Sequence, residues 1–431
     1  MRRFIGCVKR TTNGGRRCVS RTLRVCAFAV LLAPSAVAET PRAVPVDGAP
    51  FRGELTAVDA RWQLTLAVEG KTRVLPAADL VAWGRFCEPA KGPLVLLADG
   101  SLLPAKVPEA DKDNLAIDSL PFGRQKVPLE TLAGIAFHLP SDQQDRDRLL
   151  DRVLHATGDA DRLLLINGDE VTGLVETLDA ETVTIRAAVG PLKVETSRIA
   201  AVVFNPTLRQ AVQRPPLTAW VGLSDGSRLL AGKLLLDDAS LRVTTLTGQT
   251  WKTAAKELVA LQPLGGRAVY LSDLKPAAFR YTPFLGDCPS FRPSENGTVP
   301  LGSAEQRYLP WPYRADRNAT GGGLRCGGRL YLKGLGTHSK SQLTYALEPS
   351  HRRFEAELGI DDSTDGGGSV QFRVLLDGRE KFASQTIRGG APPATVSVDL
   401  AGAKTLELVV DYADRGDVLD RAGWLDARLV K

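Results

Sequence analysis

Cysteine, histidine and methionine are scarce in this sequence of 431 residues, and their scarcity narrows the chemistry that the chain can carry. The single Met is the initiator, only four His are present, and three of the six Cys fall within residues 1–38. The other thiols, Cys87, Cys288 and Cys326, form neither a CxxC pair nor a Cys/His cluster, which argues against a structural zinc site. The motif H-E-x-x-H and the P-loop are also missing, and the one G-x-S-x-G match, Gly222–Gly226, falls on an Asp-Gly turn that reads as a hairpin.

A large excess of charge is lacking as well once the N-terminus is set aside. The formal net charge of the whole chain is +6. Residues 1–38 hold eight basic residues and no acidic ones, which leaves 47 Lys+Arg against 49 Asp+Glu in the remainder. A nearly neutral body has no broad attraction for a phosphate backbone, so we expect no nucleic-acid partner.

Residues 1–38 have the pattern of a secretory signal peptide. A basic stretch precedes the apolar run Val25 to Ala33, and small residues precede a cut after Ala38. The alternative, an uncleaved anchor, is disfavoured because a membrane-spanning helix needs about 20 apolar residues. We therefore expect an exported protein, in the periplasm, the cell envelope or the medium, with no transmembrane segment after cleavage of the leader.

A weak repeat runs through residues 46–264. Each copy opens with a strand that ends in an Asp-Gly or Asn-Gly turn, at Gly48, Gly100, Gly168 and Gly226. A small residue, an alternating strand, a second turn glycine and an apolar strand follow in each copy. Because Gly and Asn accept positive φ, such turns are strong hairpin signals. We predict four small antiparallel β units, two in 46–140 and two in 163–264, whose pattern resembles Sm-like or SH3-like small barrels.

The segment 141–162 separates the second unit from the third and is rich in charge. Its apolar residues Leu149, Leu150, Val153 and Leu154 fall on one helical face. A short amphipathic helix with Ser141 as its N-cap and a charged linker both fit this pattern.

The segment 268–431 begins with a loop-rich, proline-rich stretch and then returns to strand-like runs. It contains LYLKGLGTHSKS at 330–341, FEAELGIDD at 354–362 and DRAGWLDAR at 420–428. These runs, in order and at fitting spacing, resemble the NPCBM family of carbohydrate-binding modules. The resemblance implies a jelly-roll β-sandwich of galactose-binding type, a fold often attached to glycoside hydrolases. The whole chain is thus predicted to be all-β, with tandem small β-barrel units followed by this sandwich.

The resemblance and the chemistry of sugar recognition together point to candidate ligand-binding residues. A sugar ring needs a flat aromatic face and rigid polar groups for its hydroxyls. The candidates are Trp311, Tyr313, His338, Asp361, Asp362, Arg421 and Trp424. Each also fits a structural role, the rings as core and the polar groups as local hydrogen-bonding partners. Arg421 stands where the family usually has His, and Gly423 where it has Asp. A charged guanidinium suits carboxylates or sulfates, so we expect an acidic glycan if the site functions.

Two further sites are open at this point. Five carboxylates, Asp361, Asp362, Asp365, Asp411 and Asp414, could supply oxygen ligands for a structural calcium ion, or could form turns by accepting backbone N–H groups. No other cofactor is indicated. In an oxidising compartment Cys288 and Cys326 could form a disulfide within the C-terminal module. The odd number of thiols outside the leader leaves Cys87 free or paired between chains.

The functional prediction is a carbohydrate-binding protein outside the cytoplasm that has no catalytic domain of its own. The alternative is an envelope scaffold, in which the β units hold protein partners and the sandwich binds no sugar. An undetected glycoside hydrolase is the least favoured hypothesis, because its two carboxylates cannot be picked out and no stretch of about 200 residues is left for a catalytic domain.

Overall fold

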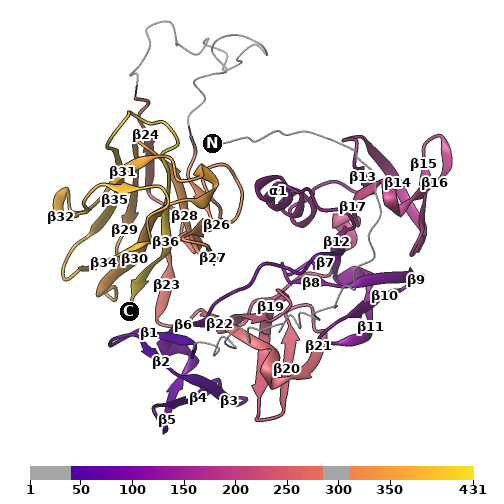
Figure 1. Cartoon of the computed structure of the whole chain (residues 1–431), viewed down its shortest axis with the longest axis horizontal. Helices are drawn as coiled ribbons and strands as arrows, with labels where there is room; N and C mark the ends of the chain where they lie inside the picture. The colour runs from indigo at the N-terminus through magenta and orange to yellow at the C-terminus, as the bar shows by residue number, and fades with distance from the viewer. Residues whose placement is uncertain (1–39, 285–310) are drawn as a thin grey trace, which may run out of the picture. The chain divides into compact units, whose positions relative to one another are not determined.

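Strands make up most of the regular structure in the computed structural model, which describes residues 40–284 and 311–431 (Figure 1). Among these residues there is one α-helix, α1 (Gln143–Leu154). Residues Thr40–Lys431 form a single compact unit. No helix in the described part of the chain is long and apolar enough to cross a membrane. The predicted all-β fold class is confirmed.

The N-terminal part contains four units with the same order of five strand positions. Strands of the first unit are β1 (Arg42–Pro45), β2 (Phe51–Arg52) with its continuation β3 (Glu54–Val58), β4 (Gln63–Val68), β5 (Lys71–Pro76) and β6 (Leu80–Gly84). Strands of the second are β7 (Leu94–Leu97), β8 (Leu102–Pro104) with its continuation β9 (Lys106–Ala110), β10 (Asn114–Ser119), β11 (Gly123–Pro128) and β12 (Leu132–Ala136). Strands of the third are β13 (Asp161–Leu165), β14 (Glu170–Asp179), β15 (Thr182–Ala187), β16 (Gly190–Glu195) and β17 (Ile199–Val203). Strands of the fourth are β18 (Thr218–Leu223), β19 (Arg228–Leu236), β20 (Ser240–Thr245), β21 (Thr250–Ala254) and β22 (Leu258–Leu264).

Within each unit the fifth strand position pairs with the first. The first pairs with the second, the second with the third, and the third with the fourth, all antiparallel. The glycine of each opening turn has a φ between 83° and 94°, as the Asp-Gly and Asn-Gly signals required. In the described residues the fourth strand never pairs with the fifth. A 3-10 turn joins them instead, as at Ala77–Asp79 and Leu129–Thr131. The units are therefore open sheets, and the closed small barrels that the pattern resembled are not found.

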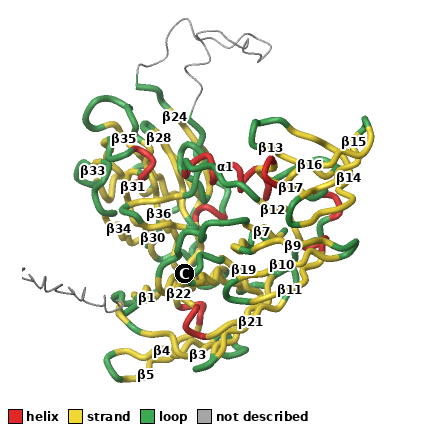
Figure 2. Tube along the Cα trace, turned by 45° about the vertical axis from the view of Figure 1, so that its right-hand side comes forward, coloured by secondary structure: helices red, strands yellow, loops and turns green. Residues whose placement is uncertain are grey.

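The units associate through strand pairs that the repeat pattern does not reveal. Strand β6 of the first unit pairs with β22 of the fourth, where Trp83 lies opposite Leu261. Strand β12 of the second pairs with β17 of the third, where Ile135 lies opposite Val202. One continuous hydrophobic core draws residues from all four units. The first unit is therefore joined edge to edge with the fourth, and the second with the third (Figure 2).

Helix α1 forms where the sequence allowed either a helix or a linker. Its N-cap is Asp142, whose carboxylate accepts a hydrogen bond from the backbone N–H of Asp145 at 2.9 Å, so the assignment of Ser141 as the cap is wrong. Asp142 is the cap because it precedes the first helical residue, and from there its carboxylate reaches the free N–H of the residue three positions on. Leu150 and Val153 are buried against β7, β12 and β17, which explains why the helix is amphipathic.

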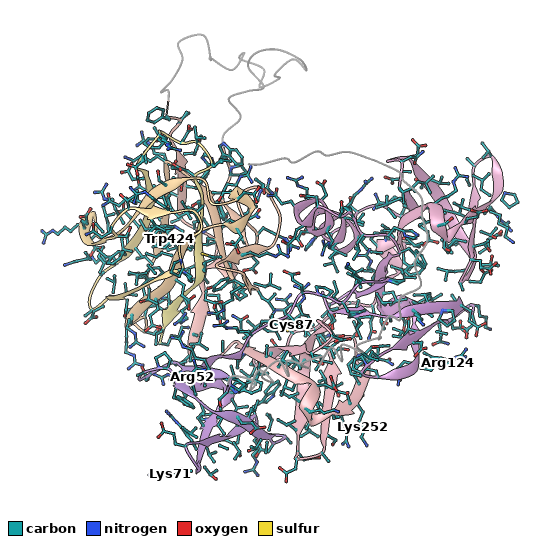
Figure 3. All side chains as sticks on the ribbon, viewed as in Figure 1. Arg52, Lys71, Cys87, Arg124, Lys252 and Trp424 are labelled. Carbon is teal, nitrogen blue, oxygen red and sulfur yellow. The ribbon has the colours of Figure 1, made fainter. Side chains whose placement is uncertain are left out.

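The C-terminal part is a sandwich of two antiparallel sheets. The first sheet has the order β25 (Arg314–Ala315), β28 (Gly334–His338), β36 (Arg421–Val430), β30 (Arg353–Ile360), β34 (Ala394–Asp399), with β23 (Ala268–Tyr270) also on β36. The second has the order β24 (Ala278–Tyr281), β29 (Ser341–Ala346), β35 (Thr405–Tyr412), β31 (Ser369–Leu376), β32 (Arg379–Ala383), with β33 (Ile387–Arg388) also on β31. A hairpin, β26 (Leu324–Cys326) and β27 (Arg329–Tyr331), is separate. Trp424 is buried in the core that both sheets share (Figure 3).

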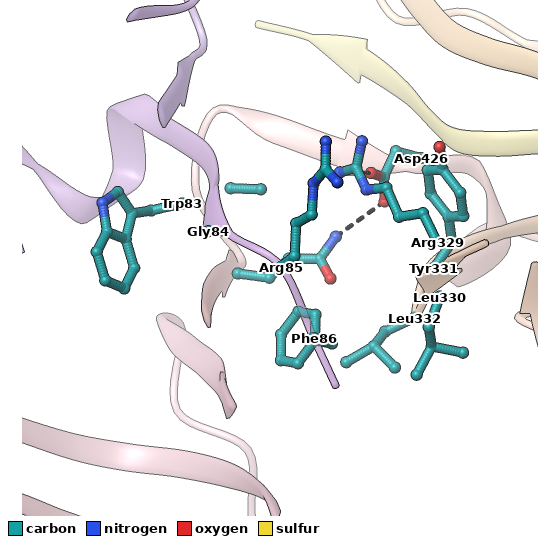
Figure 4. Close-up of a pocket in the computed structure, with 11 residues that line it drawn as sticks. Trp83, Gly84, Arg85, Phe86, Arg329, Leu330, Tyr331, Leu332 and Asp426 are labelled. Atoms are coloured by element: carbon teal, nitrogen blue, oxygen red, sulfur yellow. Dashed lines mark hydrogen bonds and ion pairs between the residues drawn. The ribbon is translucent and has the colours of Figure 1, made fainter. Parts of the chain in front are cut away.

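A buried hydrogen-bond network joins the sandwich to the first and fourth β units. The Gln262 amide of β22 donates to the Tyr270 hydroxyl and to Asp426 of β36, each at 3.0 Å. The Tyr270 hydroxyl donates to the carbonyl of Val81 in β6 at 3.2 Å. Figure 4 shows Arg85 and Arg329 beside Asp426, around a cavity of only about 10 Å³. Because Gln262, Tyr270 and Asp426 are hydrogen-bonded and little space is left between them, this junction is closely packed.

Candidate functional site

Two of the predicted sugar-binding residues are stacked rings. The indole of Trp311 lies over the imidazole of His338, with ring centroids 4.4 Å apart and planes 11° from parallel. Trp311 follows the undescribed segment and is half-buried, whereas His338 ends β28 and is buried. The stack restrains the indole, so the ring presents a fixed aromatic surface at this end of the sandwich.

Burial determines the protonation state of His338. Loss of solvent lowers the pKa of the imidazole below its usual value of 6.5. Its Nδ1 lies 3.1 Å from the carbonyl oxygen of Ser339, and only a protonated Nδ1 can donate to a carbonyl. Neutral His338 therefore carries its proton on Nδ1, and Nε2 is left as a hydrogen-bond acceptor.

Arg421, the residue that departs from the family pattern, lies next to this stack. It is the first residue of β36 and stands opposite His338 in the register of β28 and β36. Its Nη1 donates to the carbonyl oxygen of Ser363 at 3.0 Å and to the Ser363 hydroxyl at 3.3 Å. The guanidinium thus fixes the 361–365 loop beside the ring stack.

Asp361 and Asp362 are held by groups of the protein. Asp361 is 4% exposed, and its carboxylate accepts from Asn318 Nδ2 at 2.9 Å and from the backbone N–H of Arg325 at 3.0 Å. Burial raises the pKa of this carboxyl. Asp362 accepts from the N–H groups of Gly327 and Gly328 at 2.9 and 2.8 Å. Both carboxylates therefore shape the loop at the site, and Asp361 does not face solvent.

Trp424 and Tyr313 lie apart from the ring stack. Trp424 is fully buried and meets Phe354 and Phe372 edge-on, at centroid distances of 6.1 and 4.9 Å. A ligand cannot reach it, so Trp424 is removed from the candidate list. Tyr313 packs against Phe279 at 5.3 Å, at the margin of the core. The geometry therefore favours a role in the hydrophobic core for both rings.

The five predicted calcium ligands do not gather. In the described residues no group of three or more His, Cys, Asp or Glu side chains could hold a metal ion. Asp411 instead pairs with Lys340 at 3.1 Å, and Asp414 with Arg388 at 2.5 Å. Asp365 adopts a left-handed conformation at the end of the short 3-10 turn that Asp361 caps. The sequence left open whether these carboxylates hold calcium or form turns, and in the structure they serve separate turns and ion pairs.

The predicted disulfide has one partner among the described residues. Cys288 lies outside them, so the pairing stays a prediction. Cys326 is buried, and loss of solvent raises the pKa of its thiol to about 12. Cys87 is half-buried, and burial also raises the pKa of its thiol.

Sequence reasoning missed several groups of the sandwich loops. Phe284 is 51% exposed and meets Tyr412 edge-on at 5.1 Å. Leu419, also partly exposed, lies in the loop that leads into β36. Asp420 is fully buried, and its carboxylate accepts from the Ser339 hydroxyl at 2.6 Å and the Ser369 N–H at 2.8 Å. The motif DRAGW contained this aspartate, but no local signal assigned it to two distant serines.

Comparison with known proteins identifies the C-terminal part. A family model described as the NPCBM/NEW2 domain matches residues 297–430, of which the structure describes 311–430. The alpha-1,3-galactosidase B of Akkermansia muciniphila is 36% identical over 117 residues, which cover 26% of this chain and 15% of that enzyme. The chain thus spans a small share of the curated relative that it matches.

Solved structures with similarity to the chain include two from Clostridium perfringens. One is a CBM51 module of GH95 in complex with methyl-galactose, at 26% identity, 38% coverage of this chain, 99% coverage of that chain and a TM-score of 0.30. The other is CBM51-2 in complex with GlcNAc, with INT domains, of ZmpB, at 23% identity, 58% and 43% coverage and a TM-score of 0.31. The expected family resemblance is confirmed: residues 297–430 are an NPCBM/NEW2 domain.

Proposed function

We propose that this is an exported carbohydrate-binding protein without a catalytic domain of its own, which binds glycan at the stack of Trp311 and His338. The observation that carries the proposal is the stack itself, a half-buried indole held at 4.4 Å from an imidazole. A fixed aromatic ring can take the C–H face of a sugar at little entropic cost. The acceptor Nε2 of His338 supplies a polar group for a hydroxyl, and the guanidinium of Arg421 supplies one for an anionic substituent.

The position of Arg421 favours an acidic or sulfated glycan. Its Nη1 is engaged by Ser363, and among the described residues no hydrogen-bond partner is seen for Nε or Nη2. Those N–H groups lie on one edge of the planar guanidinium, the arrangement that binds carboxylate and sulfate through two hydrogen bonds. A neutral galactoside has no anionic group to pair with this guanidinium.

Titration calorimetry of the full-length protein tests both statements. The ligands are galactose, chosen because a relative is an alpha-1,3-galactosidase, and glucuronate and galactose 6-sulfate as acidic sugars. Trp311→Ala should weaken binding of every ligand, whereas Arg421→Gln should weaken only the acidic ones, each by about tenfold or more. The matched control is Arg373→Gln, which removes an arginine of β31 that pairs with Glu380 of β32. It should leave the affinity for every ligand unchanged.

Two results would contradict the proposal. Binding unchanged by Trp311→Ala would remove the ring stack from the site. Galactose bound as tightly as the acidic sugars, with no effect of Arg421→Gln, would reject the acidic ligand while retaining glycan binding.

A scaffold for protein partners is the second candidate function. The third β unit exposes four apolar side chains, Ile166, Leu174, Val189 and Leu192, and Val189 is 85% exposed. Large apolar side chains exposed on one unit are candidates for contact with a protein partner. Loss of glycan binding together with co-purification of a host partner that Val189→Asp abolishes would favour this function.

A further inference from the structure

A second cavity, of about 410 Å³, lies between the β units, helix α1 and the sandwich. Its walls come from the Asp99-Gly100 turn, the start of β19, the end of α1 and the segments 315–317 and 323–333. Leucines form much of the wall: Leu102, Leu150, Leu154, Leu230, Leu264 and Leu330. Charged side chains line the rest, so the wall is of mixed character, and the volume lies in the range of small-ligand sites, about 300–1,000 Å³.

Most charges around this cavity are paired within the protein. Arg325 binds Asp147 at 2.5 Å, and both side chains are 11% exposed. Lys333 binds Asp273 and Asp316, each at 2.7 Å. These pairs neutralise one another and leave little net charge for a ligand.

Two arginines that line the cavity are exceptions. Within residues 40–284 and 311–431, no hydrogen bond or ion pair engages the side chain of Arg228 or of Arg214. The Nε of Arg228 is buried, and loss of solvent lowers the pKa of its guanidinium. Asp147 and Glu88 interact electrostatically with Arg228 and support its charge, and Arg214 is exposed. No hydrogen bond within the described residues occupies either guanidinium, so their N–H groups are available to an anion.

An aromatic ring accompanies the two cations. Trp220 of β18 is partly buried and lines the same cavity, where its ring approaches the Gly100 turn. We propose that this cavity binds an anionic saccharide of one or two rings, with Arg228 and Arg214 on its carboxylate or sulfate and Trp220 and the leucines against its ring. The site is distinct from the Trp311–His338 stack, because no residue of that stack lines the cavity.

The test uses the full-length protein carrying Trp311→Ala, so that the stack does not contribute. Glucuronate, galactose 6-sulfate, galactose and inorganic sulfate are titrated by calorimetry and by thermal shift. The two acidic sugars should bind and raise the melting temperature, and adding Arg228→Met should weaken them about tenfold or more. Without ligand, Arg228→Met should change the melting temperature little, since no hydrogen bond within the described residues holds this guanidinium. Arg124→Met, at a solvent-exposed ion pair on β11, is the matched control.

Each other outcome overturns the proposal. Acidic sugars bound equally well after Arg228→Met would remove that residue from the site. A large loss of stability in the unliganded Arg228→Met variant would show that Arg228 has a structural partner. Inorganic sulfate bound as tightly as the sulfated sugar would exclude recognition of the ring, and galactose bound as tightly as glucuronate would exclude recognition of the charge.

Discussion

The recurring turn aspartates of the β units and two buried aspartates of the sandwich form contacts of different range. In all four units the turn after the second strand holds an aspartate whose carboxylate accepts N–H groups two and three or four residues on, at Asp59, Asp111, Asp179 and Asp237. In the sandwich Asp361 binds Asn318, 43 residues away, and Asp420 binds Ser339, 81 residues away. The first kind of contact closes a turn, and the second joins separate loops.

This difference explains why the two regions differ in how far sequence predicts them. The turn aspartates recur at spacings of 52, 68 and 58 residues, the same as those of the opening turn glycines. A contact within four residues leaves a local pattern that repeats with the unit. A contact across 81 residues leaves none, so the role of Asp420 could be found only in the fold.

Removal of Trp424 should give the largest effect, because this ring joins the two sheets of the sandwich. Trp424→Ala takes a fully buried indole from between Phe354 and Phe372 and should cost about 3–5 kcal/mol of unfolding free energy. Urea denaturation measures the loss. Trp424→Phe, which keeps an aromatic ring, should cost clearly less. A loss below about 1 kcal/mol for Trp424→Ala would mean that the core tolerates the cavity, contrary to the packing seen.

The same substitution in the two regions separates long-range from local aspartates. Asp420→Asn should cost about 1–3 kcal/mol, because the new amide cannot accept from both Ser339 and Ser369 in a buried site. Asp237→Asn should change the unfolding free energy much less, since asparagine forms the same kind of turn at an exposed position. Equal losses in urea denaturation would show that the distinction between the regions has no energetic meaning.

Particular residues show what could be predicted. Alternation and Asp-Gly turns predicted the hairpins of the β units, and the runs around His338 and Trp424 predicted an NPCBM domain. The pairing of β6 with β22 was not predictable, because alternation shows which face is buried but not which strand lies beside it. Alternation also could not decide whether Trp424 belongs to the core or to a ligand site. The Arg228 cavity left no signal in the sequence, because its lining residues come from distant segments.

Lowering the pH should change stability the least of these tests, but the turn aspartates and the buried aspartate should respond with opposite sign. Hydrogen bonds from the N–H groups of Asp113 and Asn114 lower the pKa of Asp111 to about 2, and similar bonds lower those of Asp179 and Asp237. A folded-state pKa below the unfolded value of 3.8 gives stability that is present above that pH and is lost as the pH falls toward 2. The melting temperature of a variant with all three aspartates changed to Asn should therefore fall less steeply than that of the wild type between about pH 5 and about pH 2.

The buried sandwich aspartate should behave in the opposite sense. Burial raises the pKa of Asp420, so the folded state holds its proton more tightly than the unfolded chain does. Between 3.8 and the raised pKa the contribution of this carboxyl to stability decreases as the pH rises. The stability advantage of the wild type over Asp420→Asn should thus shrink as the pH rises through that window, whereas its advantage over the triple turn variant should grow with rising pH in a lower window, between about 2 and 3.8. If the melting temperatures of all three proteins changed in parallel with pH, both assignments would be contradicted. The control is Asp414→Asn, which removes a carboxylate that belongs to neither class, from an exposed ion pair.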